Sequence, residues 1–492
     1  MNGLLLPGSL KPKLNAKTAA YYFLSILVLL LVLFTYLWYF KTSNFRADNN
    51  YYSQLAISFK KDQLHLEEKP SPALLALNNP YNYQARKGID FPWDASLYNG
   101  RFYLYWGPIP SLFLTLFDVK LLSKIGDQHL TYIFTCGLFL YIYLFSLTIW
   151  RCFFQKLPGW MFLIAIITIG LAIPFTWILS NPRIYEASIS SGQFFLIGGC
   201  YWAYASIADR TSRTWKLLLT SLHWACAIGS RVTLAPAVAF MLIMVVIMVA
   251  RENWPPVISM GTNVALLALI LPIATCGAGL IWYNWARFGS VFEFGLRYQL
   301  TSTNYLNSGN MLFSRGNIGG NLYNYLTHTF MITSNFPYVK AIENIGTNER
   351  MIGLLFTVPY FLLVLLTPAT LIQKQIKIIN PRGEDNQREL LNWLIISLIG
   401  VTVANFTLLL VYYYAAMRFM VDVAPSLLLL STIGFWRSHQ ATKSTIARVS
   451  IAALGCILAA ISIISSTLFT ISLSPDRQLI IMRILRQILH LL

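Results

Sequence analysis

The chain has 492 residues, of which 56% are apolar and only 11% are charged. Soluble domains carry roughly 25% charged residues, so this composition excludes an ordinary water-soluble protein and a disordered one. The net charge of +18 would suggest nucleic acid in a soluble chain, but here we expect no nucleic-acid partner. In a membrane protein, the distribution of basic residues indicates orientation instead.

Apolar runs of about 20 residues recur along the chain, and a helix of that length crosses the hydrocarbon core of a bilayer. The sequence therefore predicts an all-α polytopic membrane protein with about 11 transmembrane helices. Their centres lie near residues 30, 140, 170, 200, 223, 241, 271, 362, 401, 427 and 460. No small-residue cleavage site follows the first run, residues 21–40, so we expect it to be retained.

The connections between these runs alternate in character. One set is short and basic, and the positive-inside rule places it in the cytoplasm, whereas the outer face receives the two long loops and short connections near residues 183–186, 230–231 and 412–418. The basic set contains Arg151, Lys156, Arg210, Arg213, Lys216, Arg251, Lys374, Lys377, Arg382, Arg388, Arg437, Lys443 and Arg448. The predicted parts are a cytoplasmic N-terminus (1–20), a transmembrane module (21–284) that includes an outer loop (41–129), a second outer loop (285–350), C-terminal transmembrane helices (351–473) and a basic amphipathic interfacial helix (474–492).

Two segments are predicted to lie on the membrane surface. Residues 108–122 are too short to span and carry two charges, so we expect one interfacial helix there. In the C-terminal segment, Ser474 and Pro475 suit the N-cap and first helical position. Basic residues then interrupt an Ile/Leu sequence, which is typical of a helix lying at the interface; they are Arg477, Arg483, Arg486 and His490.

Asp48 opens the first outer loop, just before apolar residues that recur at helical spacing. One interpretation is an N-cap for that helix. The other is a carboxylate at the membrane surface that takes a proton from an acceptor hydroxyl or amine. Both interpretations stay open.

An aromatic segment follows in the same loop, residues 90–110 (DFPWDASLYNGRFYLYWGPIP). Tyr and Trp prefer the membrane interface, so the segment could be a simple aromatic belt. Aromatic faces with a few polar groups also hold sugars. The candidates for a wall against a sugar or acceptor are Tyr52, Trp93, Asp94, Arg101 and Tyr105.

These features together resemble the GT-C glycosyltransferases, in particular the group that contains protein O-mannosyltransferases and the lipid A aminoarabinose transferase. The similarity rests on a first span, an acidic residue before an aromatic helix, and a Gly-Arg-Tyr-Pro-rich segment leading to a surface helix. A second feature is an acidic residue at the outer end of the third span, preceded by Arg, here Glu186 after Arg183. Most relatives have Asp in place of Glu186, and Asn49 replaces the second carboxylate of the usual Asp-Glu pair.

The resemblance implies an inverting transfer from a polyprenyl-phosphate sugar at the outer interface. Asp48 would act as the base, and Glu186 would orient the acceptor or bind a divalent metal ion, the only cofactor under consideration. Cations must stabilise the departing lipid phosphate, a task suited to arginine. The candidates are Arg231, Arg287, Arg297 and Arg418.

Each of these arginines has a simpler interpretation, since a charge at the end of a span can extend to the headgroups. Arg418 and Asp422 are four residues apart and could also form an ion pair on one helical face. We favour Arg418 for the phosphate, because it lies near a tyrosine cluster at the mouth of a span.

The sequence therefore predicts an integral membrane glycosyltransferase that moves a hexosyl or pentosyl group to a glycan, lipid or protein acceptor. The expected location is the bacterial inner membrane, with the active site on the extracytoplasmic face. Two alternatives stay open: an O-antigen polymerase or ligase type of enzyme, and a lipid or solute transporter. A transporter would be expected to carry charges in mid-span or paired broken helices.

The orientation can be tested with single cysteines at Ser71, Asn310 and Gly383. In intact cells, a membrane-impermeant maleimide should label the first two positions and leave Gly383→Cys unmodified until lysis. The parent chain, whose six cysteines lie in or beside apolar runs, is the control. Labelling of Gly383→Cys in intact cells, with none of Ser71→Cys, would reverse the orientation.

Overall fold

The computed structural model describes residues 16–43, 50–251, 260–306, 312–344, 347, 349–367 and 384–491. The chain is an integral membrane protein, since seven described segments are helical, long and apolar enough to cross a bilayer. They are Ala19–Lys41, Asp127–Phe153, Trp160–Ser180, Val232–Arg251, Asn263–Phe288, Gln387–Val411 and Thr445–Ser472. The other predicted centres, near 200, 223, 362 and 427, also fall in helices, so the number of eleven spans stays a prediction.

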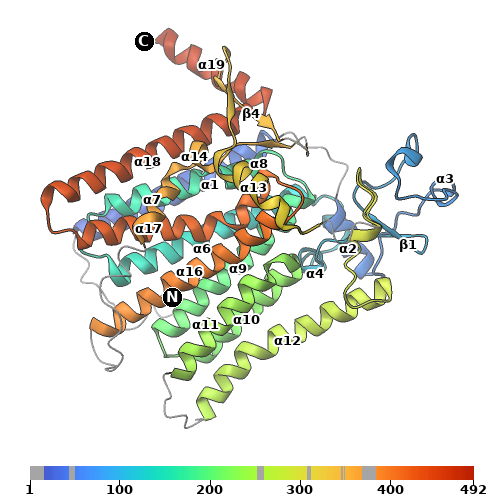
Figure 1. Ribbon diagram of the computed structural model, residues 1–492, viewed down its shortest axis with the longest axis horizontal. Helices are drawn as coiled ribbons and strands as arrows, with labels where there is room; N and C mark the ends of the chain where they lie inside the picture. The colour runs from blue at the N-terminus through green and yellow to red at the C-terminus, as the bar shows by residue number, and fades with distance from the viewer. Residues whose placement is uncertain are drawn as a thin grey trace.

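The long helices run side by side in one bundle (Figure 1). They are α1 (Ala16–Lys41), α6 (Asp127–Phe153), α7 (Trp160–Leu171), α8 (Ile173–Ser180), α9 (Ile184–Ala208), α10 (Arg213–Ser230), α11 (Ala235–Arg251), α12 (Met260–Phe288), α16 (Glu384–Val411), α17 (Ala424–Ala441) and α18 (Thr445–Ser472). The end of α1 lies beside the start of α6, because Phe40 stacks on Tyr132 with ring centroids 4.9 Å apart, and the end of α12 and the segment after α16 line one common cavity. As a result, both long loops emerge at one end of the bundle, here called the loop end.

The first loop folds into short elements at the loop end (Figure 1). They are α2 (Tyr51–Phe59), α3 (Pro72–Leu75), η1 (Tyr83–Arg86), the antiparallel pair β1 (Ser96–Tyr98) and β2 (Arg101–Tyr103), α4 (Ile109–Leu114) and α5 (Val119–Leu122). The prediction of one surface helix over residues 108–122 is wrong. The helix stops and restarts because the Asp118 carboxylate accepts the backbone N–H of Leu121 at 2.7 Å and caps α5.

The second loop and the segments after it are equally short. They are η3 (Leu296–Tyr298), η4 (Arg315–Asn317), α13 (Ile318–Leu322), η5 (Tyr323–Thr327), β3 (Phe330–Ile332), β4 (Val339–Glu343), β5 (Arg350–Met351), α14 (Leu354–Thr357) and η6 (Pro359–Leu365). The three strands form an antiparallel sheet in which Phe330 pairs with Ala341 and Ile342 with Met351. Phe330 packs edge-on against Phe469 of α18, which fixes the sheet to the bundle.

The span predicted near residue 170 is broken in two. Pro174 lies in the first turn of α8, where a proline is tolerated, and it ends the continuous hydrogen bonding of α7. The freed backbone N–H of Ile173 donates to the Ser466 hydroxyl of α18 at 3.1 Å, and Ser466 donates to the carbonyl of Thr357. This satisfies backbone groups that water cannot reach within a bilayer.

The two long loops are joined to each other by backbone hydrogen bonds. The N–H of Asp94 donates to the carbonyl of Leu300 at 3.0 Å, and the N–H of Leu300 donates to the carbonyl of Ala95 at 2.9 Å. The Ser96 hydroxyl donates to the carbonyl of Gly295 at 2.8 Å. Segments about 200 residues apart in sequence thus form one layer over the loop end, here called the roof (residues 94–96 and 295–300).

The C-terminal segment forms the predicted helix, α19 (Pro475–Leu491), with Ser474 as its cap. Arg477 corrects the expectation that the basic residues face the interface, because its side chain is completely buried. Its guanidinium donates to the Thr42 hydroxyl, to the Ser180 hydroxyl and carbonyl, and to the Thr470 carbonyl, at 2.8–3.2 Å. The ends of α1, α8 and α18 are therefore joined through one cation.

Burial lowers the pKa of Arg477 to about 10, so the group stays charged at neutral pH. Within the part of the chain that the structure describes, no carboxylate forms an ion pair with it. Its charge is stabilised instead by neutral acceptors and by the face of Tyr39, 5.3 Å from the guanidinium carbon.

Arg477→Ala should therefore lower the midpoint of thermal unfolding in detergent, with a loss of at least about 2 kcal/mol, because several charge-assisted hydrogen bonds disappear together. Arg483→Ala is the matched control, since Arg483 lies on the same helix and is exposed. Equal midpoints for the two variants would contradict this role of Arg477.

Candidate active site

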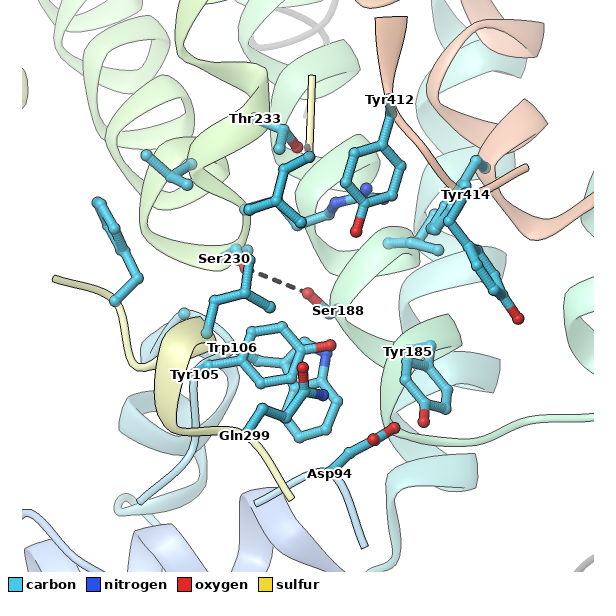
Figure 2. Close-up of a pocket in the computed structure, with 18 of the residues that line it drawn as sticks. Asp94, Tyr105, Trp106, Tyr185, Ser188, Ser230, Thr233, Gln299, Tyr412 and Tyr414 are labelled. Atoms are coloured by element: carbon cyan, nitrogen blue, oxygen red, sulfur yellow. Dashed lines mark hydrogen bonds between the residues drawn. The ribbon is translucent and has the colours of Figure 1, made fainter. Parts of the chain in front are cut away.

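A cavity of about 700 Å³ lies at the loop end beneath the joined loops. Its walls come from the first loop, the start of α9, the connection between α10 and α11, the end of α12, the second loop and the segment after α16. Figure 2 shows aromatic side chains and hydroxyl groups around the space, among them Tyr105, Trp106, Tyr185, Ser230 and Tyr412. Five arginines and four carboxylates also line it: Arg183, Arg231, Arg287, Arg297, Arg418, Asp94, Glu293, Glu349 and Asp422.

Arg418 pairs with Glu349, a residue of the second loop. Its Nη1 lies 2.8 Å from Glu349 Oε1, which also accepts the hydroxyl of Tyr414 at 2.9 Å. Burial alone would raise the pKa of Glu349, but Arg418 and Tyr414 hold it below its ordinary value. The guanidinium lies over the ring of Tyr185, 4.8 Å from its centroid, so Arg418 is fixed at the cavity wall.

Arg231 pairs with Asp422 across the bundle. Arg231 follows α10, whereas Asp422 ends the 3₁₀ helix η7 (Met417–Asp422), and Nη1 lies 2.9 Å from Oδ2. Gln193 donates to the same carboxylate at 3.3 Å, and Asn405 donates to the backbone carbonyl of Asp422 at 2.7 Å. The predicted alternative of an Arg418–Asp422 pair is therefore wrong, because each residue finds its partner on a different element.

Arg287 is buried at the end of α12 and faces the cavity. It donates to the carbonyls of Leu104 and Tyr283 and to the side-chain oxygen of Asn284, at 2.6, 3.2 and 2.8 Å. Among the described residues no carboxylate forms an ion pair with it. The charge is held in place, and the carboxylate of Glu293 in the same cavity acts on it without forming an ion pair.

Two further arginines stand at the edge of the cavity. Arg297 is exposed and donates only a long hydrogen bond, 3.4 Å, to the carbonyl of Leu306. Arg183 has a half-exposed side chain whose Nε lies 3.9 Å from Glu186 Oε2. Both side chains can reorient toward an anion at little cost, unlike Arg231 and Arg418.

Asp94 lies in the roof of the cavity in an unusual conformation. Its backbone φ is 65°, in the left-handed region that residues other than glycine rarely adopt. The residue is only 5% exposed, and its Oδ1 atom is buried without a hydrogen-bond partner. Figure 2 shows its carboxylate directed toward Tyr185 at the cavity wall.

Burial raises the pKa of the Asp94 carboxyl to about 6, against the opposing effects of the Thr301 hydroxyl and the guanidinium groups of Arg418, Arg183 and Arg86. A carboxyl with that pKa is largely ionised at neutral pH and yet accepts a proton readily.

The structure thus brings together Trp93, Asp94, Tyr105 and all four predicted phosphate-binding arginines. It does not bring Tyr52 or Arg101 to the cavity: Tyr52 is fully buried in α2, and Arg101 is exposed on β2. Asp48 lies outside the described residues, so its role stays a prediction.

Glu186 lies in the first turn of α9 and is 2% exposed. Its Oε2 accepts the backbone N–H of Arg183 at 3.1 Å, which caps the helix, and it does not line the cavity. Among the residues that the structure describes, no three His, Cys, Asp or Glu side chains are grouped to hold a metal ion. A divalent metal stays a prediction.

Sequence reasoning missed two carboxylates. Asp127, the first residue of α6, accepts the backbone N–H groups of both Tyr51 and Tyr52 at 3.1 Å and so caps α2, the task considered for Asp48. Glu349 was missed because it lies in a polar loop with no periodic pattern. For Asp127, the position of an acidic residue directly before a span was an available signal.

No family model matches this sequence, and no curated protein matches it significantly. Solved structures of the oligosaccharyltransferase from Archaeoglobus fulgidus are similar at 13% identity. The apo crystal structure matches with a TM-score of 0.47, covering 92% of this chain and 56% of that one. The structure in complex with an inhibitory peptide and a dolichol-phosphate matches with a TM-score of 0.45, covering 91% and 56%. This chain therefore spans about half the length of the archaeal chain.

The Arg231–Asp422 pair yields a stability prediction. Arg231→Met and Asp422→Asn should each lower the thermal unfolding midpoint in detergent, at a cost of about 3 kcal/mol, because removing one partner leaves a buried charge unpaired. The double variant should cost less than the sum of the two.

Glu67→Gln is the matched control, since the Lys61–Glu67 pair is exposed and such pairs contribute little. Strictly additive effects of Arg231→Met and Asp422→Asn would contradict the pairing.

Proposed function

We propose that this protein is a membrane glycosyltransferase that takes a sugar from a polyprenyl-phosphate donor and transfers it to an acceptor on the extracytoplasmic face of a bacterial inner membrane. The observation that carries the proposal is the cavity itself. It combines uncompensated guanidinium groups, aromatic walls and a raised-pKa carboxyl at one end of a membrane-spanning bundle. These are the groups that a phosphate-linked sugar requires.

The lipid phosphate is assigned to Arg287 and Arg297. Arg418 and Arg231 share their charge with Glu349 and Asp422, whereas Arg287 and Arg297 form no ion pair among the described residues. When the glycosidic bond breaks, its electron pair leaves with the phosphate oxygen, and unneutralised guanidinium groups stabilise that charge best. This revises the preference for Arg418 that the sequence alone suggested.

The lipid tail and the sugar would bind against different parts of the cavity lining. Leu280 of α12, Val232 of the connection between α10 and α11, and Phe292 give part of the cavity an apolar lining that would suit the lipid tail. Tyr105, Trp106 and Tyr185 form an aromatic wall nearer to Asp94 (Figure 2). An aromatic face against the apolar side of a sugar ring, with hydroxyls at its edge, is a common way to bind a sugar.

The direct test is transfer by the purified protein. A panel of radiolabelled polyprenyl-phosphate sugars, presented in vesicles with candidate glycan, lipid and protein acceptors, should yield a labelled product and free polyprenyl phosphate with at least one donor. Release of neither from any donor would contradict the proposed function.

Substitution of Arg297 tests the donor-binding site most directly. Arg297→Gln should weaken binding of a polyprenyl phosphate about tenfold or more, because one charge-assisted contact is lost. Arg297→Lys should recover only part of the affinity, since it keeps the charge but loses the planar fork.

Arg315→Gln serves as the control, because Arg315 is an exposed arginine of the same loop that does not line the cavity. Binding can be measured in nanodiscs by native mass spectrometry. Equal affinity for Arg297→Gln and Arg315→Gln would remove Arg297 from the donor site.

A further inference from the structure

We propose that Asp94 is the catalytic base of the transfer, the group that takes the proton from the attacking acceptor. The inference rests on the proposed function and goes beyond it, because it assigns the proton to a residue of the loop roof rather than to Asp48. It is carried by the backbone conformation, the unpartnered carboxylate oxygen and the position of the residue over the cavity.

The first observation is the left-handed backbone conformation of Asp94. A left-handed aspartate costs free energy, and such residues persist where surrounding bonds force them and where function benefits. Here the neighbouring hydrogen bonds force it: the N–H of Asp94 binds the carbonyl of Leu300, and the carbonyl of Ala95 binds the N–H of Leu300. The second loop therefore holds the Asp94 carboxylate in a fixed position at the cavity.

The second observation is the free hydrogen-bonding capacity of the carboxylate. Most buried polar atoms in proteins have a partner, yet Asp94 Oδ1 has none. Arg86, buried on η1, has two guanidinium nitrogens without partners and lies close enough to affect Asp94, but it donates to the Thr301 carbonyl instead. Although the Thr301 hydroxyl stabilises the carboxylate, Oδ1 keeps free hydrogen-bonding capacity, which suits a group that must accept a proton.

The chemistry balances with these groups. The acceptor oxygen or nitrogen attacks the anomeric carbon and forms the new glycosidic bond, while the bond from that carbon to the phosphate oxygen breaks. The electron pair leaves with the lipid phosphate, and the acceptor proton passes to the Asp94 carboxylate. No oxidant, reductant or further reactant is needed.

The charged and titratable groups that act electrostatically on Asp94 do not themselves titrate between pH 5 and 7. They are the guanidinium groups of Arg86, Arg183 and Arg418 and the phenols of Tyr51, Tyr105 and Tyr305. Arginine is effectively always protonated, and burial raises the pKa of each of these three tyrosines, so none changes charge in that range. A base with a pKa of about 6 is active when ionised, so kcat/KM should fall about tenfold per pH unit as the pH drops below 6.

The test uses Asp94→Asn, Asp48→Asn and the control Asp90→Asn in the full chain. Asparagine tolerates the left-handed conformation and keeps the shape, so Asp94→Asn removes the base with little effect on the fold, which a thermal unfolding midpoint will verify. We expect Asp94→Asn to lower kcat at least about a hundredfold, with unchanged polyprenyl-phosphate binding and a residual rate independent of pH between 5 and 7. Asp90, exposed in the same loop, should tolerate the change.

A second variant separates catalysis from positioning. Glycine also tolerates a positive φ, and Asp94→Gly leaves room at the site, so added formate should accelerate it several-fold by replacing the carboxylate. A structural role would not respond to formate.

Wild-type kcat and pH dependence in Asp94→Asn, or an Asp94→Gly enzyme that formate does not accelerate, would overturn the assignment while the transferase function stood. Absence of transfer by the wild type itself would overturn both.

Discussion

Burial of guanidinium groups is the constraint on which the loop end depends. A buried arginine is stabilised where its N–H groups meet acceptors, and for three arginines here those acceptors come from distant parts of the chain. Arg231 reaches Asp422, Arg418 reaches Glu349, and Arg287 reaches the carbonyl of Leu104. Each contact joins two elements that are distant in sequence, so the charges that shape the cavity also position its walls.

The same constraint separates two kinds of arginine. Arg231 and Arg418 are neutralised by carboxylates and fix elements of the bundle, whereas Arg287 and Arg297 leave positive charge facing the cavity. Burial of Arg287 away from any carboxylate partner among the described residues is costly unless a ligand balances its charge. In the proposed function a phosphate ligand would supply that negative charge, which would link the energetics of the fold to the proposed substrate.

The joined loops add a second constraint, because they cover part of the cavity. Asp94, Ala95 and Ser96 of the first loop bond to Gly295 and Leu300 of the second, so the roof forms only when both are folded. A roof of this kind strengthens electrostatic interactions beneath it by lowering the local dielectric. It also explains why a carboxyl of the roof has a raised pKa although three arginines lie near it.

The sequence predicted features that depend on neighbouring residues better than features that depend on contacts between distant residues. Helices fall at all eleven predicted centres because an apolar run has few alternatives in a bilayer. The break at Pro174 and the restart at Asp118 have local signals in the sequence. Our interpretation missed them because it gave more weight to the length of each apolar run. The partner of Asp127 in α2 and the partner of Arg418 could not be identified from the sequence, since each contact joins residues about 70 or more positions apart.

For Arg477, the periodicity of α19 predicted a basic amphipathic helix but not which basic residue docks against the protein. Trp93, Asp94, Tyr105 and the four arginines were named as candidates from their chemistry, and the structure places them around one cavity. Polar and aromatic residues that gather at one membrane face have few uses other than a site.

The central claim is that the cavity binds a phosphate-linked sugar lipid. An experimental structure in a lipid nanodisc, with a non-hydrolysable polyprenyl-phosphonate sugar bound, tests it most directly. The account predicts the phosphonate within hydrogen-bond distance of Arg287 and Arg297, and the sugar against Tyr105 and Tyr185 beneath Asp94. A ligand bound away from the loop end, or one whose phosphonate contacts none of the cavity arginines, would contradict it.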